Sequence, residues 1–320
     1  MDERNLNMLE ELLQSYENEK LMAIAKIHHV ELMKEGEEVA LAERVKEKIL
    51  DPVEMQNFFL CTQTDEIEAF EMILQNAESA VPEEILSYLL VGGYCKREGA
   101  DSFSIPWEVK EGYLEMNTKV FQVQRKRTER IANYCHAANN LYAVAPPSQV
   151  VVLFNQYEPE PVTEEEIIST YGILHLHRCN FVYEEGLFID EKLIEDKRYV
   201  DLYQRQQNSP FYIPPKEEIE ILAQYDQTAI TEEMRTAAKY LMEELKAPED
   251  AVIEACSILQ IVIRKGGKLE DAMELLRDYR IQFQTEEQVE TFVGLLVELW
   301  NHSRMVLNRG YTPAEMQEYE

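Results

Sequence analysis

The chain has 320 residues, and 61 Asp and Glu against 31 Lys and Arg give it a formal net charge of −30 at pH 7. A duplex carries about one negative charge per 1.7 Å of its axis, so a protein that binds DNA needs a basic face. The composition therefore disfavours DNA binding by most of this surface. Apolar residues make up 45% of the chain, and glycine and proline are modest at 11 and 12. These values favour folded, mainly helical domains.

Three features of the sequence predict a cytoplasmic protein without a membrane partner. The start, MDERNLNMLEELL, is acidic and lacks the pattern of a secretory signal peptide. No apolar run approaches the roughly 18–20 residues that span a bilayer. The cysteines are scattered and form no CxxC pair, which is typical of reduced thiols; they are Cys61, Cys95, Cys135, Cys179 and Cys256.

Residues 1–80 are expected to form an N-terminal helical module. Apolar residues recur at helical spacing in three stretches, and two further helices begin at Asp51-Pro52 and at Thr64. The three stretches are residues 4–16, 18–34 and 37–49.

Residues 81–225 contain two segments with the outline of a winged helix: a helix, a β-hairpin and a short helix. In the first, a helix over 83–91 precedes a hairpin whose turn is residues 98–101, and another helix starts at Pro106. In the second, a capping box at Thr163 opens a helix, and strands flank a turn at 184–186. Helices over 121–142 and 147–157 join the two, and a further helix is expected over 215–224.

Residues 226–320 are expected to form a C-terminal helical bundle, with a domain boundary near 226–231. The predicted helices cover 232–246, 248–264, 268–280 and 285–307. The whole chain is therefore predicted to be mainly α with small β-hairpins.

Two stretches resemble known families. EKLMAIAKIHHVELMKEGEEVALAERVKEKIL (19–50) resembles the helix–extended–helix module at the N-terminus of transcription terminator Rho. Glu35, Glu37 and Glu38 stand where that module is usually basic, which argues against nucleic-acid binding here. An ordinary helical hairpin is the alternative.

The string LWNHSRMVLNRGYTPAEM (299–316) resembles the end of a helical region in uncharacterised bacterial proteins that often also carry a SEC-C zinc-binding motif. IPWEVKEGYLEMN, FVYEEGLFID and SPFYIPPKEEI also look like those proteins. The SEC-C tail is absent, because no cysteine follows Cys256, so the resemblance implies no zinc. It also implies no firmly assigned activity. The matching positions are Asn301, Arg304, Asn308, Gly310, Tyr311, Thr312, Pro313 and Glu315.

The same string predicts a structural stop and start. Gly310 suits a left-handed helix end, Thr312 suits an N-cap, and Glu315 completes a capping box. Asn301 and Arg304 are expected on one helix face as i, i+3 neighbours. We expect a structural clamp, in which Arg304 bonds carbonyls of the following turn; a ligand or partner site is the alternative.

One cluster has metal-like spacing. On a strand, alternate side chains share a face, so His175, His177 and Cys179 could converge on zinc. No fourth ligand is evident nearby, and the alternative is a strand with exposed histidines. We expect no metal and no cofactor.

A basic segment stands out in this acidic chain. Residues 119–150 hold five basic residues and one acidic residue, a net charge of +4. Four of the bases, Arg125, Lys126, Arg127 and Arg130, are candidates for partner binding. They either pair with the acidic surface of the same chain or dock an acidic partner.

No sequence pattern of an enzyme is present: we find no P-loop, GxGxxG or GxSxG. We therefore expect a non-enzymatic interaction or regulatory protein that binds another protein through its winged-helix-like units. One alternative is a nucleic-acid-associated regulator that contacts DNA or RNA through residues 119–130. Another is an acidic DNA mimic.

Overall fold

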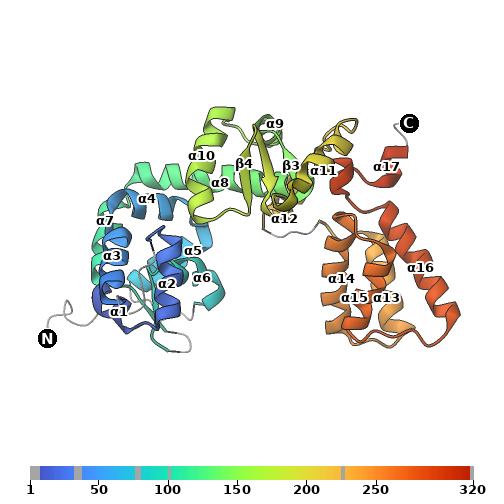
Figure 1. Cartoon of the computed structure of the whole chain (residues 1–320), viewed down its shortest axis with the longest axis horizontal. Helices are drawn as coiled ribbons and strands as arrows, with labels where there is room; N and C mark the ends of the chain where they lie inside the picture. The colour runs from blue at the N-terminus through green and yellow to red at the C-terminus, as the bar shows by residue number, and fades with distance from the viewer. Residues whose placement is uncertain (1–7, 32–37, 76–80, 100–101, 225–227, 318–320) are drawn as a thin grey trace. The chain divides into compact units, whose positions relative to one another are not determined.

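The computed structural model describes residues 8–31, 38–75, 81–99, 102–224 and 228–317 (Figure 1). It is mainly helical with small antiparallel strand pairs, which confirms the predicted fold class. The chain divides into two compact units, one of residues 1–131 and 170–179 and the other of residues 132–169 and 180–320. The boundary expected at 226–231 lies within the second unit and partly on residues 225–227, outside the described residues.

The first unit is helical at its start, as predicted. Its helices are α1 (Leu9–Ser15), α2 (Asn18–Ile27), α3 (Glu38–Leu50), α4 (Pro52–Leu60), α5 (Thr64–Leu74), α6 (Glu83–Val91) and α7 (Trp107–Met116). Asp51 begins α4 by accepting hydrogen bonds from the N–H groups of Val53 and Glu54, so the predicted Asp-Pro start is confirmed. The link between α2 and α3 includes residues 32–37, which lie outside the described residues together with Glu35 and Glu37.

Aromatic side chains form much of the first unit's core. Phe59 contacts Phe70, Tyr94 and Tyr113, with ring centroids 5.2, 5.0 and 5.1 Å apart. Phe59 and Phe70 are fully buried. This packing holds α4, α5 and α7 together, because Phe59, Phe70 and Tyr113 belong to these three helices.

The first predicted hairpin is present. Strand β1 (Lys96–Arg97) pairs antiparallel with β2 (Phe103–Ser104), and Lys96 lies opposite Ser104. The expected turn at 98–101 includes residues 100–101, which the structure does not describe. Helix α7 then starts after Pro106, as predicted.

Two long helices contribute residues to both units. They are α8 (Lys119–Tyr142) and α10 (Glu164–His177). Helix α9 (Pro147–Tyr157) lies between them in sequence and belongs to the second unit.

The second unit contains a three-stranded antiparallel sheet in the order β3-β5-β4. Strands β4 (Phe181–Glu184) and β5 (Leu187–Asp190) form the second predicted hairpin, whose turn residues Glu185 and Gly186 both have positive φ. The sequence did not predict β3 (Val144–Ala145) or α11 (Arg198–Gln206). Tyr199 of α11 packs against Val144 of β3 and Ile189 of β5. The identity of either hairpin as part of a winged helix stays a prediction.

Short helices connect the sheet to a helical bundle. They are the 3-10 helices η2 (Glu191–Leu193) and η3 (Glu195–Lys197), followed by α11 and then α12 (Lys216–Gln224). The bundle helices are α13 (Glu232–Glu243), α14 (Glu249–Arg264), α15 (Leu269–Asp278) and α16 (Glu286–Asn301), and Leu241, Leu259, Leu276 and Phe292 are fully buried in its core. Thr231 and Thr285 cap α13 and α16 through their hydroxyl groups.

The end of the last long helix differs from the prediction. Helix α16 ends at Asn301 rather than near residue 307, and a 3-10 turn, η4 (Val306–Asn308), follows before α17 (Pro313–Gln317). The loop closes on itself because Gly310 N–H donates to the Met305 carbonyl and Met305 N–H donates to the Tyr311 carbonyl. Asn301 and Arg304 therefore do not share a helix face.

Among the described helices, none combines the length and the apolar character needed to cross a membrane.

Candidate functional site

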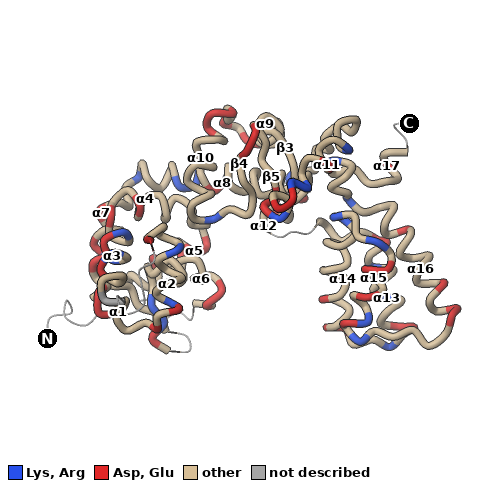
Figure 2. Tube along the Cα trace, in the orientation of Figure 1, with Lys and Arg blue, Asp and Glu red and all other residues tan. Residues whose placement is uncertain are grey.

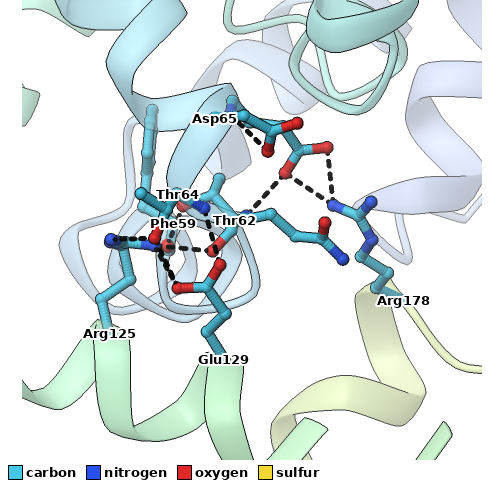
Figure 3. A network of polar contacts seen from close by, with 9 residues as sticks. Phe59, Thr62, Thr64, Asp65, Arg125, Glu129 and Arg178 are labelled. Carbon is cyan, nitrogen blue, oxygen red and sulfur yellow. Dashed lines mark hydrogen bonds and ion pairs between the residues drawn. The ribbon is translucent and has the colours of Figure 1, made fainter. Parts of the chain in front are cut away.

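Arg125, the first residue of the predicted basic site, is buried. Only 3% of it is exposed, and its guanidinium donates to the Thr62 carbonyl at 3.0 Å and to the Thr64 hydroxyl at 3.3 Å (Figure 3). These bonds hold α8 against the start of α5. The structure thus gives Arg125 an internal contact and not the surface position that the sequence suggested.

The one acidic residue of the segment, Glu129, also points inward. Its carboxylate accepts from the N–H and the hydroxyl of Thr64, both at 2.7 Å, and from Arg125 at 3.3 Å. A second carboxylate at the same helix start, Glu66, accepts two hydrogen bonds from Arg178 at 2.6 and 2.7 Å. The polar groups around the start of α5 are therefore satisfied within the first unit.

The outward side of α8 consequently carries bases and valines, whereas the carboxylate of Glu129 points inward. Val120 is 77% exposed and Val123 is 70% exposed, while Lys119 and Lys126 are exposed. Arg127 and Arg130 are half-buried. Val120, Val123, Arg127 and Arg130 follow one another at three- and four-residue steps, so they lie on one stripe of the helix. Acidic residues occur on helices of both units (Figure 2), which sets this stripe apart.

A hollow of about 420 Å³ lies beside Val120, and Glu115 of α7 also lines it. Met55 of α4, Met116 of α7 and Phe121 of α8 contribute to its wall, and Val120 lies at the same hollow. Gly112 lets α7 approach α4, because a Cβ there would lie 2.9 Å from the Met55 sulfur. We call Lys119, Val120, Val123, Lys126 and this hollow the α8 surface.

A second cluster joins two of the recognisable sequence strings. Arg304 donates to the Glu315 carboxylate and to the Tyr212 hydroxyl, both at 2.6 Å, and lies over the Tyr212 ring at 3.7 Å. Its Nε is 3.5 Å from the Glu218 carboxylate. Arg304 was expected to bond carbonyls of the following turn; it bonds these side chains instead. SPFYIPPKEEI and the 299–316 string therefore meet at one point.

The predicted stop and start within that string are confirmed. Gly310 has a φ of +87°, and Thr312 and Glu315 form a reciprocal capping box, with bonds of 2.9 and 3.1 Å. A Cβ at Gly310 would lie 2.9 Å from Leu141 Cγ, so the position also needs glycine for space. Asn308 closes the 3-10 turn: its N–H donates to the Met305 carbonyl and its own carbonyl accepts from Tyr311 N–H.

Electrostatics around Arg304 favour a structural contact. A hollow of about 420 Å³ adjoins it and is lined in part by Glu218, His302 and Glu315. Burial raises the pKa of Glu218, while the Arg304 guanidinium opposes that rise. Burial favours a higher pKa for Glu315, but the hydrogen bonds from the Thr312 N–H and Arg304 outweigh burial and lower that pKa. Both terminal nitrogens of Arg304 donate to protein groups, so its charge is committed to holding the loop.

The metal-like cluster is not on a strand. Helix α10 continues to His177, so His175 and His177 point about 200° apart around the helix. Across the described residues, no group of three or more His, Cys, Asp or Glu side chains is placed to hold a metal ion. His177 instead packs against Phe58, with ring centroids 5.4 Å apart, and burial lowers its pKa to about 4. The prediction of a strand was wrong, because His175 and His177 lie on a helix.

No protein-family model, curated protein or solved structure matches this chain. The α8 surface and the Arg304 cluster therefore have to be interpreted from their own chemistry. The sequence indicated the bases of α8 as a site but gave no such role to Val120 and Val123. The helical spacing of these valines with the bases was the available indication.

Proposed function

We propose that this chain is a non-enzymatic interaction or regulatory protein whose winged-helix-like units serve as protein-binding surfaces. The α8 surface carries the proposal, and it includes α7 of the first such unit. Val120, which is 77% exposed, lies beside a hollow walled in part by methionines, and Val123, which is 70% exposed, follows it by three residues on α8. Exposed apolar groups beside a concave site favour association with another protein.

The energetics suit a protein partner. Burying a valine side chain is worth about 1.5–3 kcal/mol relative to leaving it exposed. Two such residues, together with an apolar group of the partner in the hollow, can supply the central contacts of an interface. Methionine walls adapt to differently shaped side chains, because the side chain is unbranched and flexible.

Nucleic-acid association is the weaker alternative, because Arg125 is no longer available for phosphate contact. Of the bases in residues 119–130, Lys119 and Lys126 are exposed, and two phosphate contacts would give a slope of log affinity against log salt of about −2. The net charge of −30 repels a polyanion over most of the surface. The alternative thus predicts only weak binding near physiological salt.

Site-specific photo-crosslinking tests the proposal. A photoreactive amino acid replaces Val123 in the full chain, expressed in the organism that makes it. Ile253 of α14, which is 59% exposed, is replaced in the same way as a matched control. We expect one discrete protein adduct from position 123 that survives nuclease treatment and is absent from position 253. Equal adducts at both positions, or adducts that nuclease removes, would contradict the proposal.

A further inference from the structure

We infer that the hollow beside Arg304 binds a small primary alkylammonium ion, whose ammonium group donates hydrogen bonds to the Glu218 carboxylate. The hollow measures about 420 Å³ and is built from residues of the second unit alone. Its size is that of a small-molecule site and far exceeds what a bare metal ion needs. None of the residues described at its wall belongs to the α8 surface.

The Glu218 carboxylate is buried without a close donor. Only 8% of the residue is exposed, yet its contacts within the described part of the chain are long: Tyr212 Oη at 3.4 Å and Arg304 Nε at 3.5 Å. A carboxylate usually accepts charge-assisted bonds of about 2.5–2.9 Å, and it has room for about four. Burial accordingly raises the pKa of Glu218. A cationic donor in the hollow would complete its hydrogen bonding and match its charge.

The charges around the hollow favour a cation. Among the residues described at its wall, Arg304 is the one Lys or Arg, and it faces two carboxylates, Glu218 and Glu315. Its short bonds, both 2.6 Å, go to Glu315 and to a neutral hydroxyl, so Glu218 keeps only the 3.5 Å contact. His302 also lines the hollow, but it is exposed and its Nδ1 is 3.8 Å from the Glu233 carboxylate, which would balance a proton there. One negative charge is therefore in excess, and an anion would be repelled.

The rest of the wall suits a short alkyl chain. Ala229 and Ala314 contribute methyl groups, and threonines contribute methyl and hydroxyl groups. The hydroxyls of Thr231 and Thr312 already accept from backbone N–H groups in the first turns of α13 and α17. Glu218 is consequently the strongest acceptor left for an ammonium group, and the alkyl chain lies against the methyl groups.

Titration with three small probes tests this inference. The probes n-butylammonium, 1-butanol and n-butyrate have similar lengths and differ in the charge of the polar end. The full chain carries isotope-labelled alanine methyl groups, so the NMR signals of Ala229 and Ala314 report binding at the hollow. We expect n-butylammonium to shift both signals saturably, with a dissociation constant in the millimolar range, and the other probes to bind about tenfold more weakly or less. Equal binding of the three probes, stronger binding of n-butyrate, or no saturable shift would overturn the inference.

Three variants locate the bound cation. Glu218→Gln keeps the shape of the side chain and removes its charge, so it should weaken n-butylammonium binding by about tenfold. Glu217→Gln removes the same charge from an exposed neighbour on α12 and should leave binding unchanged. Ala314→Leu fills the hollow without altering a charge and should abolish the shift of the Ala229 signal.

Unchanged affinity in Glu218→Gln would overturn the role of Glu218, and binding that survives Ala314→Leu would place the cation outside the hollow. The comparison of the three probes needs no variant, so it decides the matter even where Glu218→Gln is destabilised.

Discussion

Gly310→Ala provides a quantitative test of the C-terminal loop. Gly310 has a φ of +87°, where an L-residue costs about 1–2 kcal/mol. The added Cβ would also lie 2.9, 3.0 and 3.2 Å from three carbon atoms of Leu141, and such overpacking costs about 1–3 kcal/mol. We therefore expect Gly310→Ala to lower the free energy of unfolding of the second unit by about 2–5 kcal/mol.

Gly186→Ala is the matched control. Gly186 has a similar φ of +81°, but a Cβ there would meet no atom within 4 Å. This variant should show only the backbone cost, about 1–2 kcal/mol. The difference between the two variants isolates the contact with Leu141.

Urea denaturation followed by tryptophan fluorescence measures both. The chain has two tryptophans, and in a Trp107→Phe background Trp300 of α16 reports on the second unit alone. Equal losses for the two glycine variants would refute the close approach of Gly310 to Leu141. A loss at neither position would show that the loop does not need a left-handed residue.

Four further outcomes are expected. Thr312→Ala should cost about 1 kcal/mol in the same urea assay, because the Glu315 N–H loses its cap; no change would exclude the capping role. Arg125→Met should destabilise the first unit by about 3 kcal/mol, whereas exposed Lys126→Met should change it by less than about 0.5 kcal/mol; equal effects would place Arg125 on the surface. Burial lowers the pKa of His177 from 6.5 to about 4, so the folded state binds fewer protons than the unfolded state between these values. The stability that the neutral, buried His177 contributes is therefore complete above pH 6.5 and is lost as pH falls toward 4. His177→Phe should consequently reduce the fall in melting temperature between about pH 7 and 5. An unaltered fall would show that His177 is not desolvated. Fluorescence anisotropy should find weak or no binding to random duplex DNA at about 150 mM salt, and tight binding there would promote the nucleic-acid alternative.

The sequence by itself determined the helical architecture. Apolar periodicity located most helices, and local chemistry located several of their ends: Asp51 begins α4, and Gly310 with Thr312 marks the final stop and start. These features are predictable because capping bonds and backbone preferences act within a few residues. The two hairpins were predictable for the same reason.

Only the tertiary structure decided what the charged and apolar residues of α8 do. Arg125 and Lys126 are neighbours in a basic run, yet one donates to Thr62 inside the first unit and the other is exposed. Arg304 and Tyr212 are 92 positions apart and meet through a hydrogen bond that no local pattern encodes. Strand β3 exists because β5 supplies its partner, and His177 lies on a helix whose end local spacing did not reveal. In each case the outcome depends on contacts between segments distant in sequence, which set burial and hydrogen bonding and override the preference of a residue for water or for a strand.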